Sequence, residues 1–402
     1  MIPEPETQIL TAPCLPDYSG NSIVNLMRSI AQSLGRSDLP AAPLRALADV
    51  QQMLAQRSKV VLFVVDGLGF DYLMSQTAGS TLRQFVRGSL TSVFPSTTAT
   101  AITTFLTGRA PIQHGSTGWH MWFPQLATTG AILTLKRRQT GQPLAALGLD
   151  PAEFFDQQSF FAGLPVPSFA LGPERILNSE YNRAYSKGAQ RRGCASLEHL
   201  FSSTLECLCS SQDRCYIYAY FADFDSLAHS EGIASRAPMQ LLRRFDDAFA
   251  GFLSAARGLD ATVLVCADHG FIDSPRNRII ELANHPRLEA CLRLPLCGER
   301  RAAYCYVRPG AEKMFEDYVT SELHDRAWLH RSGDLVEAGW FGPSDAGVHP
   351  QLRERIGDYT LVMQDNWTIK DWLPGEKRYR HIGVHGGVTH NEMFVPLVVA
   401  QP

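Results

Sequence analysis

Aspartate and histidine side chains follow two apolar runs of this sequence at positions where they could bind a metal ion. Asp66 follows the run Val60–Val65, and Asp268 and His269 follow the run Thr262–Ala267. A single aspartate after a strand is more often a turn residue or a helix cap than a ligand. Two adjacent ionisable groups after an apolar strand are costly to bury without compensation. A divalent cation would supply that compensation.

A third apolar run, Tyr216–Phe221, leads into another aspartate and histidine. Asp225 and His229 are four residues apart, a step that places both side chains on the same face of a helix. They could therefore share a metal ion. Asp223 is an alternative to Asp225, but it lacks this step to a histidine. Mixed aspartate and histidine ligands are typical of zinc, with manganese as the alternative.

A fourth segment, Gly383–Gly387, precedes the apolar run Val395–Ala400 and could bring His385 to the same place. His381 and His390 flank His385 and are the alternatives to it. His381 lies four residues earlier, so one helix could present both side chains.

A hydroxyl-rich segment could supply a nucleophile. Seven serine and threonine residues lie between Ser96 and Thr107, directly after Pro95. The simplest interpretation is an N-capped helix whose small residues pack against a sheet. The start of such a helix also offers free N–H groups to an anion. A threonine hydroxyl there, in contact with a divalent metal, can lose its proton and become a nucleophile.

Four apolar runs, at residues 60–65, 216–221, 262–267 and 395–400, are predicted to be strands buried on both faces, because their apolar positions are mostly consecutive. Helical periodicity occurs in Ser22–Leu34, Leu44–Gln56, Leu197–Ser210 and Pro238–Arg257. This alternation predicts a layered α/β fold with helices on both faces of the sheet. Ligands bind such folds at the carboxyl ends of the strands, where the candidate side chains lie.

Two stretches interrupt the alternation. Residues 115–192 are rich in loops and contain a strand-like segment, Gly130–Arg137. Residues 272–384 contain shorter elements, namely the strand-like Ala302–Val307, the helical Ala311–Leu323 and the strand-like Ala327–His330. We therefore expect an α/β core formed by residues 1–271 and 385–402, which includes the loop-rich insertion. Residues 272–384 would form a small α+β insertion, or cap.

Composition excludes several classes of protein. The chain has 402 residues, 45% of them hydrophobic, so it is not disordered, and its formal net charge of −3 provides no field for a nucleic-acid polymer. Its apolar runs are far shorter than the ~18 residues of a membrane span. Its first residues do not resemble a signal peptide. Nine cysteines without C-x-x-C spacing indicate free thiols, so we expect a cytoplasmic protein.

Five motifs, taken together and in order, resemble those of the alkaline phosphatase superfamily, and within it the type I phosphodiesterase/nucleotide pyrophosphatase family. They are Asp-Gly at 66–67, Phe-Pro-x-x-Thr at 94–98 leading to Leu-Thr-Gly at 106–108, Asp-x-x-x-His at 225–229, Asp-His-Gly at 268–270 and His-Gly-Gly at 385–387. The resemblance spans most of the chain. It implies an alkaline-phosphatase-like fold.

The resemblance also implies a role for each matching position. Thr98, rather than Ser96 or Thr97, would be the nucleophile, forming a covalent phosphoryl-threonine that water then hydrolyses. Two divalent metal ions would assist, each with three ligands: Asp66, Asp268 and His269 for the first, and Asp225, His229 and His385 for the second. The Thr98 oxygen would also contact the first ion.

Two positions depart from the family pattern. Ala101 stands where members often have an asparagine that holds a phosphate oxygen, so phosphate would depend on backbone N–H groups and metals, and nucleotide pyrophosphatase activity proper is less favoured. Ala228 replaces the usual glycine before His229, which is a milder change. The sulfatase signature Cys/Ser-x-Pro-x-Arg is absent from this position, which disfavours sulfate esters.

We therefore expect a metal-dependent phosphoric ester hydrolase, a phosphodiesterase in type, acting on a small-molecule phosphoester with two ions, zinc or else manganese. A phosphonate hydrolase or a phosphomonoesterase could use the same site. A binding protein that retains the fold without catalysis is the alternative from another class. A dinucleotide enzyme is disfavoured because no G-x-G-x-x-G occurs after residues 60–65. Trp119, Trp122 and Phe123 would line the pocket or pack within the insertion.

Overall fold

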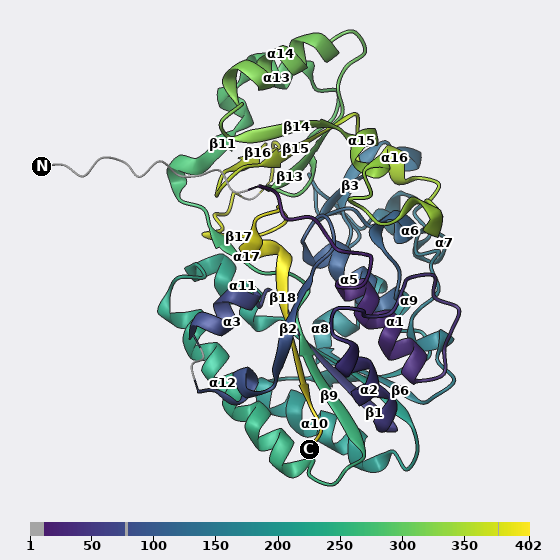
Figure 1. Ribbon diagram of the computed structural model, residues 1–402. Helices are drawn as coiled ribbons and strands as arrows, with labels where there is room; N and C mark the ends of the chain where they lie inside the picture. The colour runs from purple at the N-terminus through teal and green to yellow at the C-terminus, as the bar shows by residue number, and fades with distance from the viewer. Residues whose placement is uncertain (1–11, 77–78, 377) are drawn as a thin grey trace, which may run out of the picture.

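A seven-stranded sheet forms the centre of the computed structural model, which describes residues 12–76, 79–376 and 378–402 (Figure 1). Its strands lie in the order β2 (Val86–Thr91), β18 (Phe394–Ala400), β9 (Ala261–Cys266), β1 (Lys59–Val65), β8 (Cys215–Phe221), β6 (Ser168–Pro173) and β7 (Ala189–Cys194). The four apolar runs of the sequence are β1, β8, β9 and β18, so their prediction as strands is confirmed. Every residue of β1, β8 and β9 is buried, as expected for strands covered on both faces.

The direction of the strands brings several chain segments to one edge of the sheet. β1 is parallel to β8 and β9, whereas β18 is antiparallel to β9. The carboxyl ends of β1, β8 and β9 therefore lie at the same edge as the start of β18. A short antiparallel pair, β10 (Ile272–Asp273) and β17 (Gly383–Val384), holds the segment before His385 beside the chain that leaves β9.

Helices cover both faces of this sheet (Figure 1). On one face α10 and α12 pack together, and Phe63 of β1 lies 4.8 Å from Phe201 of α10 and 6.4 Å from Phe245 of α12 between ring centroids. On the other face α1 contacts α2 and α5. The bounds are α1 Ile23–Ser33, α2 Ala48–Gln56, α5 Thr98–Thr107, α10 Leu197–Ser210, α11 Asp223–Glu231 and α12 Arg236–Ala255. The four helical segments predicted from periodicity are confirmed as α1, α2, α10 and α12.

Shorter helices occupy the connections. They are α3 Phe70–Gln76, α4 Thr81–Gln84, α6 Pro111–His114, α7 Pro151–Phe154, α8 Glu174–Leu177, α9 Glu180–Tyr185, α15 Ser332–Glu337, α16 Leu352–Arg355 and α17 His390–Met393. Across the described ranges of the chain, none of the helices is both long and apolar enough to cross a membrane.

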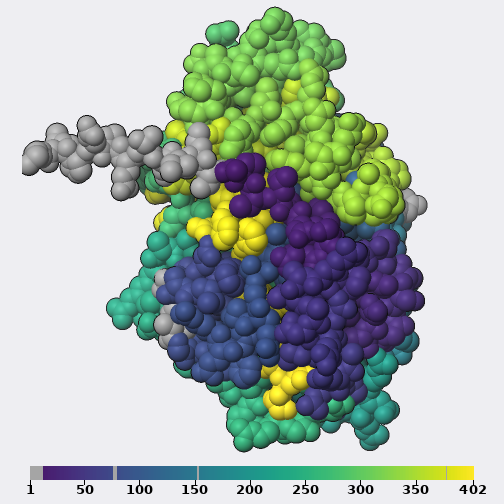
Figure 2. Space-filling view, in the orientation of Figure 1, coloured from purple at the N-terminus to yellow at the C-terminus, as the bar shows by residue number. Residues whose placement is uncertain are grey.

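A second seven-stranded sheet lies beyond the carboxyl edge of the first. Its order is β14 (Ala327–Arg331), β15 (Tyr359–Met363), β13 (Ala302–Cys305), β12 (Cys297–Gly298), β3 (His120–Phe123), β4 (Thr128–Ala131) and β5 (Lys136–Arg137). α13 (Pro286–Cys291) and α14 (Glu312–Glu322) pack on it over a separate apolar cluster. Figure 2 shows the green chain of this region above the purple and blue chain of the core.

Two features of the second sheet differ from the sequence prediction. The strand-like segment Gly130–Arg137 is not one strand: it comprises the ends of β4 and β5 with a turn between them, where Leu135 has a positive φ of 47°. In addition, β3 pairs with β12, so a segment of the expected loop-rich insertion shares a sheet with the segment 272–384. Apolar periodicity gives no signal for a pairing between strands so far apart in the sequence.

We expect Phe63→Ala to destabilise the fold by about 3–5 kcal/mol, because the ring is fully buried among the aromatic side chains of α10 and α12. Equilibrium unfolding in urea measures this loss. Met314→Ala is the matched control, since its side chain on α14 is 43% exposed and should cost less than about 1 kcal/mol. Equal losses in the two variants would contradict the described core.

Candidate metal centre

A cavity of about 440 Å³ opens between the carboxyl edge of the central sheet and the second sheet. Thr98, Asp225, His229 and His385 line one side of it. The other predicted ligands, at the ends of β1 and β9, lie buried directly behind this lining. All seven predicted site residues are therefore brought to one place.

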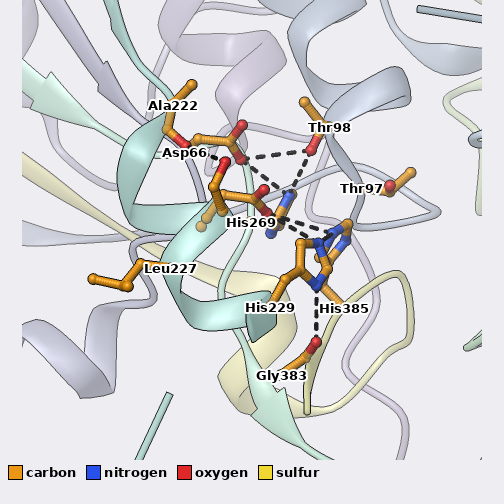
Figure 3. A network of polar contacts seen from close by, with 12 residues as sticks. Asp66, Thr97, Thr98, Ala222, Leu227, His229, His269, Gly383 and His385 are labelled. Carbon is orange, nitrogen blue, oxygen red and sulfur yellow. Dashed lines mark hydrogen bonds and ion pairs between the residues drawn. The ribbon is translucent and has the colours of Figure 1, made fainter. Parts of the chain in front are cut away.

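The first group of side chains surrounds the Thr98 hydroxyl (Figure 3). Thr98 Oγ1 lies 3.1 Å from His269 Nε2 and 3.5 Å from Asp66 Oδ1. His269 Nε2 is also 3.4 Å from Asp66 Oδ1 and 3.4 Å from Asp268 Oδ2. Asp66, Asp268 and His269 thus present three potential ligand atoms within 4.8 Å of one another, next to the hydroxyl.

The second group joins α11 to the segment after β17. Asp225 and His229 do lie on one helical face, with Asp225 Oδ1 3.4 Å from His229 Nε2. His385 Nε2 lies 3.2 Å from His229 Nε2 and 3.7 Å from Asp225 Oδ1. The two groups are adjacent, because the rings of His269 and His385 stack with their centroids 3.7 Å apart.

Hydrogen bonds orient the histidines for metal binding. His229 Nδ1 lies 2.8 Å from the carbonyl oxygen of Gly383 (Figure 3). His269 Nδ1 lies 3.1 Å from the carbonyl oxygen of Gly270. A carbonyl oxygen can only accept, so each Nδ1 carries the proton and each Nε2 presents a lone pair to the centre.

The carboxylates of this centre lack compensating charge. Asp66, Asp225 and Asp268 form ion-pair contacts only with histidines among the described residues, and none with lysine or arginine. Asp225 Oδ1 and Asp268 Oδ2 are buried, and neither accepts a hydrogen bond within the described part of the chain. Burying an ionised carboxylate without a partner costs on the order of several kcal/mol of folding free energy. The donor set therefore fits divalent cations.

The pKa shifts of Asp66 and Asp225 reflect this lack of compensating positive charge. Burial, together with the Asp225 and Asp268 carboxylates, raises the pKa of Asp66 well above its usual value. Burial also raises the pKa of Asp225, although His229 opposes this. For His385, burial and the neighbouring histidines lower the pKa well below its usual value, so its imidazole is neutral at pH 7 and able to bind a metal.

Two residues that support the centre are not among those predicted from the sequence. The Tyr220 hydroxyl of β8 donates to Asp66 Oδ2. Glu299 Oε1 accepts from the Thr97 hydroxyl at 2.8 Å and from the Trp119 N–H at 2.6 Å, and burial raises the pKa of Glu299 to about 7. A polar group inside an apolar strand pattern could have marked Tyr220. No motif spacing connects Glu299 to this site.

The alternative hydroxyls are engaged elsewhere. Ser96 donates to the carbonyl of Gly387 at 2.7 Å, and Thr97 is the N-cap residue of α5 and contacts Glu299. Thr98 begins α5, whose first turn offers unpaired backbone N–H groups to an anion.

The alternative acids and histidines lie outside the two groups. Asp223 is exposed, and His390 is bonded to Asp71 at 2.7 Å on the surface. His381 lines the cavity and lies against His229, with centroids 4.1 Å apart.

The aromatic residues after α5 divide between the two expected roles. Trp119 lines the cavity. Trp122 lies 6.5 Å from Tyr306, and Phe123 is buried 5.1 Å from Phe154, both between ring centroids.

The chain matches a known protein family in sequence and known structures in fold. The model of the type I phosphodiesterase/nucleotide pyrophosphatase family matches residues 60–388. Murine ectonucleotide pyrophosphatase/phosphodiesterase 5 is structurally similar, with a TM-score of 0.63, 16% sequence identity, and coverage of 86% of this chain and 88% of that chain. An inactive variant of that protein in complex with AMP has a TM-score of 0.62 and 16% sequence identity, and the match covers 85% of this chain and 87% of that chain.

A second similar structure belongs to a different enzyme. Phosphonoacetate hydrolase from Sinorhizobium meliloti 1021, in complex with phosphonoformate, has a TM-score of 0.63 and 16% identity, with coverage of 86% of this chain and 90% of that chain. At this identity the likeness shows a shared fold. No curated protein sequence matches the chain.

We expect metal-free wild-type protein to lose stability relative to Asp66→Asn as the pH rises from about 4 to 8. An acid with a raised folded pKa contributes its stability below the unfolded pKa, and that stability is lost as the pH rises through the folded pKa. Urea midpoints measured with a chelator present test this trend.

The same comparison at saturating zinc should reverse the order, because the native carboxylate would then bind the ion and stabilise the folded state. A difference between the two proteins that changes with neither pH nor zinc would show that Asp66 is not part of a metal centre.

Proposed function

Because the chain belongs to the type I phosphodiesterase/nucleotide pyrophosphatase family, within the alkaline phosphatase superfamily, we propose that it hydrolyses small phosphodiesters with Thr98 as nucleophile and two divalent ions as cofactors. The family match extends over residues 60–388 and so includes every residue of the candidate centre. The chain is accordingly an enzyme that acts on phosphoric ester bonds.

One observation carries the choice of mechanism. Three carboxylates, two of them fully buried, and three histidines gather at the place where Asp66 and His269 contact the Thr98 hydroxyl, and two of the carboxylate oxygens have no hydrogen-bond partner among the described residues. A catalytically inactive binding protein would have no need for all seven of these side chains. The alternative of a non-catalytic protein is therefore the weaker one.

The proposed reaction has two steps. The Oγ1 of Thr98 gives up its proton to solvent and attacks phosphorus in line, so that an Oγ1–phosphorus bond forms while the bond to the leaving-group oxygen breaks and that oxygen departs with the bonding electron pair. A water molecule then attacks phosphorus and the Oγ1–phosphorus bond breaks. One proton of that water restores the Thr98 hydroxyl, and the phosphomonoester is released.

When bound, the divalent ions would make the Thr98 hydroxyl more acidic and neutralise charge on the phosphoryl and leaving oxygens. The first would be held by Asp66, Asp268 and His269, and the second by Asp225, His229 and His385. We propose zinc, because neutral imidazole and carboxylate ligands in this mixture suit it, with manganese as the alternative.

The start of α5 would hold the phosphoryl group. Backbone N–H groups of its first turn and the positive end of the helix dipole favour an anion beside Thr98. Ala101 is buried in this helix and offers no side-chain donor. Phosphate binding would therefore depend on the backbone and the ions.

Phosphonate hydrolysis is the second candidate. The structural likeness to phosphonoacetate hydrolase supports phosphonate hydrolysis. The likeness to the pyrophosphatase supports diester hydrolysis to the same extent. A phosphomonoesterase could use the same centre. We also propose a cytoplasmic location, because nine free thiols suit a reducing compartment.

Thr98→Ala should lower kcat for bis(4-nitrophenyl) phosphate by about a thousandfold or more, because the attacking oxygen is removed. Thr98→Ser should retain measurable turnover. Release of 4-nitrophenolate by zinc-loaded protein gives the rates.

The matched control is Thr100→Ala on the same helix, because the Thr100 hydroxyl is buried, makes no hydrogen bond within the described residues and does not line the cavity. Its rate should stay within about threefold of wild type. Full activity in Thr98→Ala would eliminate the proposed nucleophile.

Purified wild-type protein should contain about two divalent ions per chain, and Asp225→Asn should contain about one, because the second group loses a ligand. Elemental analysis after dialysis measures the content. His390→Ala is the control and should keep both ions, since His390 pairs with Asp71 at the surface. Loss of metal from the control, or full content in Asp225→Asn, would contradict the assignment.

A further inference from the structure

Part of the cavity lining carries a neutral ionic network that includes Arg138, Lys370 and Asp371. Arg138 donates to Asp371 Oδ1 at 2.6 Å and to Glu376 Oε2 at 3.1 Å. Lys370 Nζ donates to Glu376 Oε1 at 3.2 Å. Two cations thus match two carboxylates, and the Arg138 guanidinium is also bonded to the carbonyl oxygens of Leu296 and Asp371. This network has no free charge for a ligand.

Arg300 also lines the cavity, and its charge is not matched. Within the described ranges of the chain, its guanidinium makes no ion pair, and its Nη2 is buried without a hydrogen-bond partner. The nearest acid in sequence, Glu299, directs its Oε1 to Thr97 and Trp119 instead. A buried, unsatisfied guanidinium N–H costs free energy unless a ligand accepts from it.

Aromatic rings hold this guanidinium in place. The Cζ of Arg300 lies 5.0 Å from the ring centroid of Tyr379 and 5.6 Å from that of Trp372. Such stacking occupies the faces of the planar group and leaves its N–H edges for in-plane bonds. Paired N–H groups in this arrangement match the two oxygens of a carboxylate or phosphate.

A histidine beside Arg300 leaves the guanidinium charge unmatched. Burial, together with Arg138, Lys370 and Arg300, lowers the pKa of His120 well below its usual value, so its imidazole is neutral at pH 7. His120 therefore provides no counter-anion for Arg300.

We propose that Arg300 binds a second anionic group of the substrate while the phosphorus lies at Thr98. The substrate class is then a small phosphoester or phosphonate that carries a further oxyanion, a carboxylate or a phosphate, at a distance set by the cavity. This inference rests on the proposed function for the position of the phosphorus. A substrate with one neutral end would leave Arg300 unpaired.

The test is direct binding, measured by isothermal titration calorimetry with zinc-loaded full-length protein. The probes are three series matched in chain length from two to four carbons: alkylphosphonates, ω-carboxyalkylphosphonates and α,ω-bisphosphonates. Each member with a second anion is compared with the neutral-ended member of the same length. The carboxylate and bisphosphonate series distinguish the two kinds of oxyanion.

In wild type, at least one member with a second anion should bind about tenfold or more tightly than its neutral-ended counterpart, as expected for a charge-assisted bidentate contact. Arg300→Gln should reduce this ratio to near one, and Arg300→Lys should keep part of it. Arg378→Gln is the matched control, because Arg378 lies over the same Trp372 ring, at 5.9 Å, and does not line the cavity. Its ratio should equal that of wild type.

The inference is overturned if no second anion improves binding in wild type, or if Arg300→Gln keeps the ratio. An equal loss in Arg378→Gln would also overturn it. The proposed function is judged separately, by turnover of bis(4-nitrophenyl) phosphate. A protein that shows the Arg300-dependent ratio but cleaves no ester would refute the function and retain the anion subsite.

Discussion

Three aspartates at one edge of the sheet, which no lysine or arginine of the described residues neutralises, are the feature around which this structure is organised. Asp66, Asp225 and Asp268 arrive from three different segments, and each leaves the apolar interior at the same edge of the sheet. Their mutual repulsion and desolvation oppose folding, as the raised pKa of Asp66 shows. Such a cluster fits divalent cations, and the surrounding imidazoles are suited to share in binding them.

The apolar sheet is what makes this cluster rigid. Strands β1, β8 and β9 are buried along their whole length, so their ends cannot shift without disturbing the packing of α10 and α12. Hydrogen bonds then fix individual atoms: Asp268 Oδ1 accepts from the N–H groups of Gly67 and His269, at 2.9 and 3.0 Å. The remaining carboxylate oxygens are left to face the centre. Packing energy is thereby used to hold a polar site in a fixed geometry.

The cavity combines two electrostatic environments. One part of its lining is a cluster of acids suited to metal ions. Another part carries Arg300 beside an ionic network in which two basic and two acidic side chains balance each other. An elongated anion could be stabilised at both ends, by the ions and by the guanidinium. Because segments that adjoin the strands of the second sheet supply Arg300 and its neighbours, variation in those segments would change substrate choice without altering the chemistry at Thr98.

The sequence predicts the parts of this site that local pattern encodes. Asp66, Asp268 and His269 are identifiable because they follow directly on apolar runs, and Asp225 and His229 because their spacing matches a helical turn. Tyr220, Glu299 and Arg300 were not identified, since each reaches the site through tertiary packing that leaves no spacing rule. The pairing of β3 with β12 was missed for the same reason, because strand partners distant in sequence leave no periodic signal. A turn at residues 132–135 separates β4 from β5, so the segment predicted as one strand is two.

The most direct test of the central claim is a crystal structure of the zinc-loaded protein with vanadate, with anomalous scattering at the zinc edge. We expect two zinc peaks ~3.5–4 Å apart, one bound by Asp66, Asp268 and His269 and the other by Asp225, His229 and His385. The vanadium should be bonded to Thr98 Oγ1. A single peak, peaks outside these ligands, or vanadate held away from Thr98 would contradict a two-ion centre with Thr98 as nucleophile.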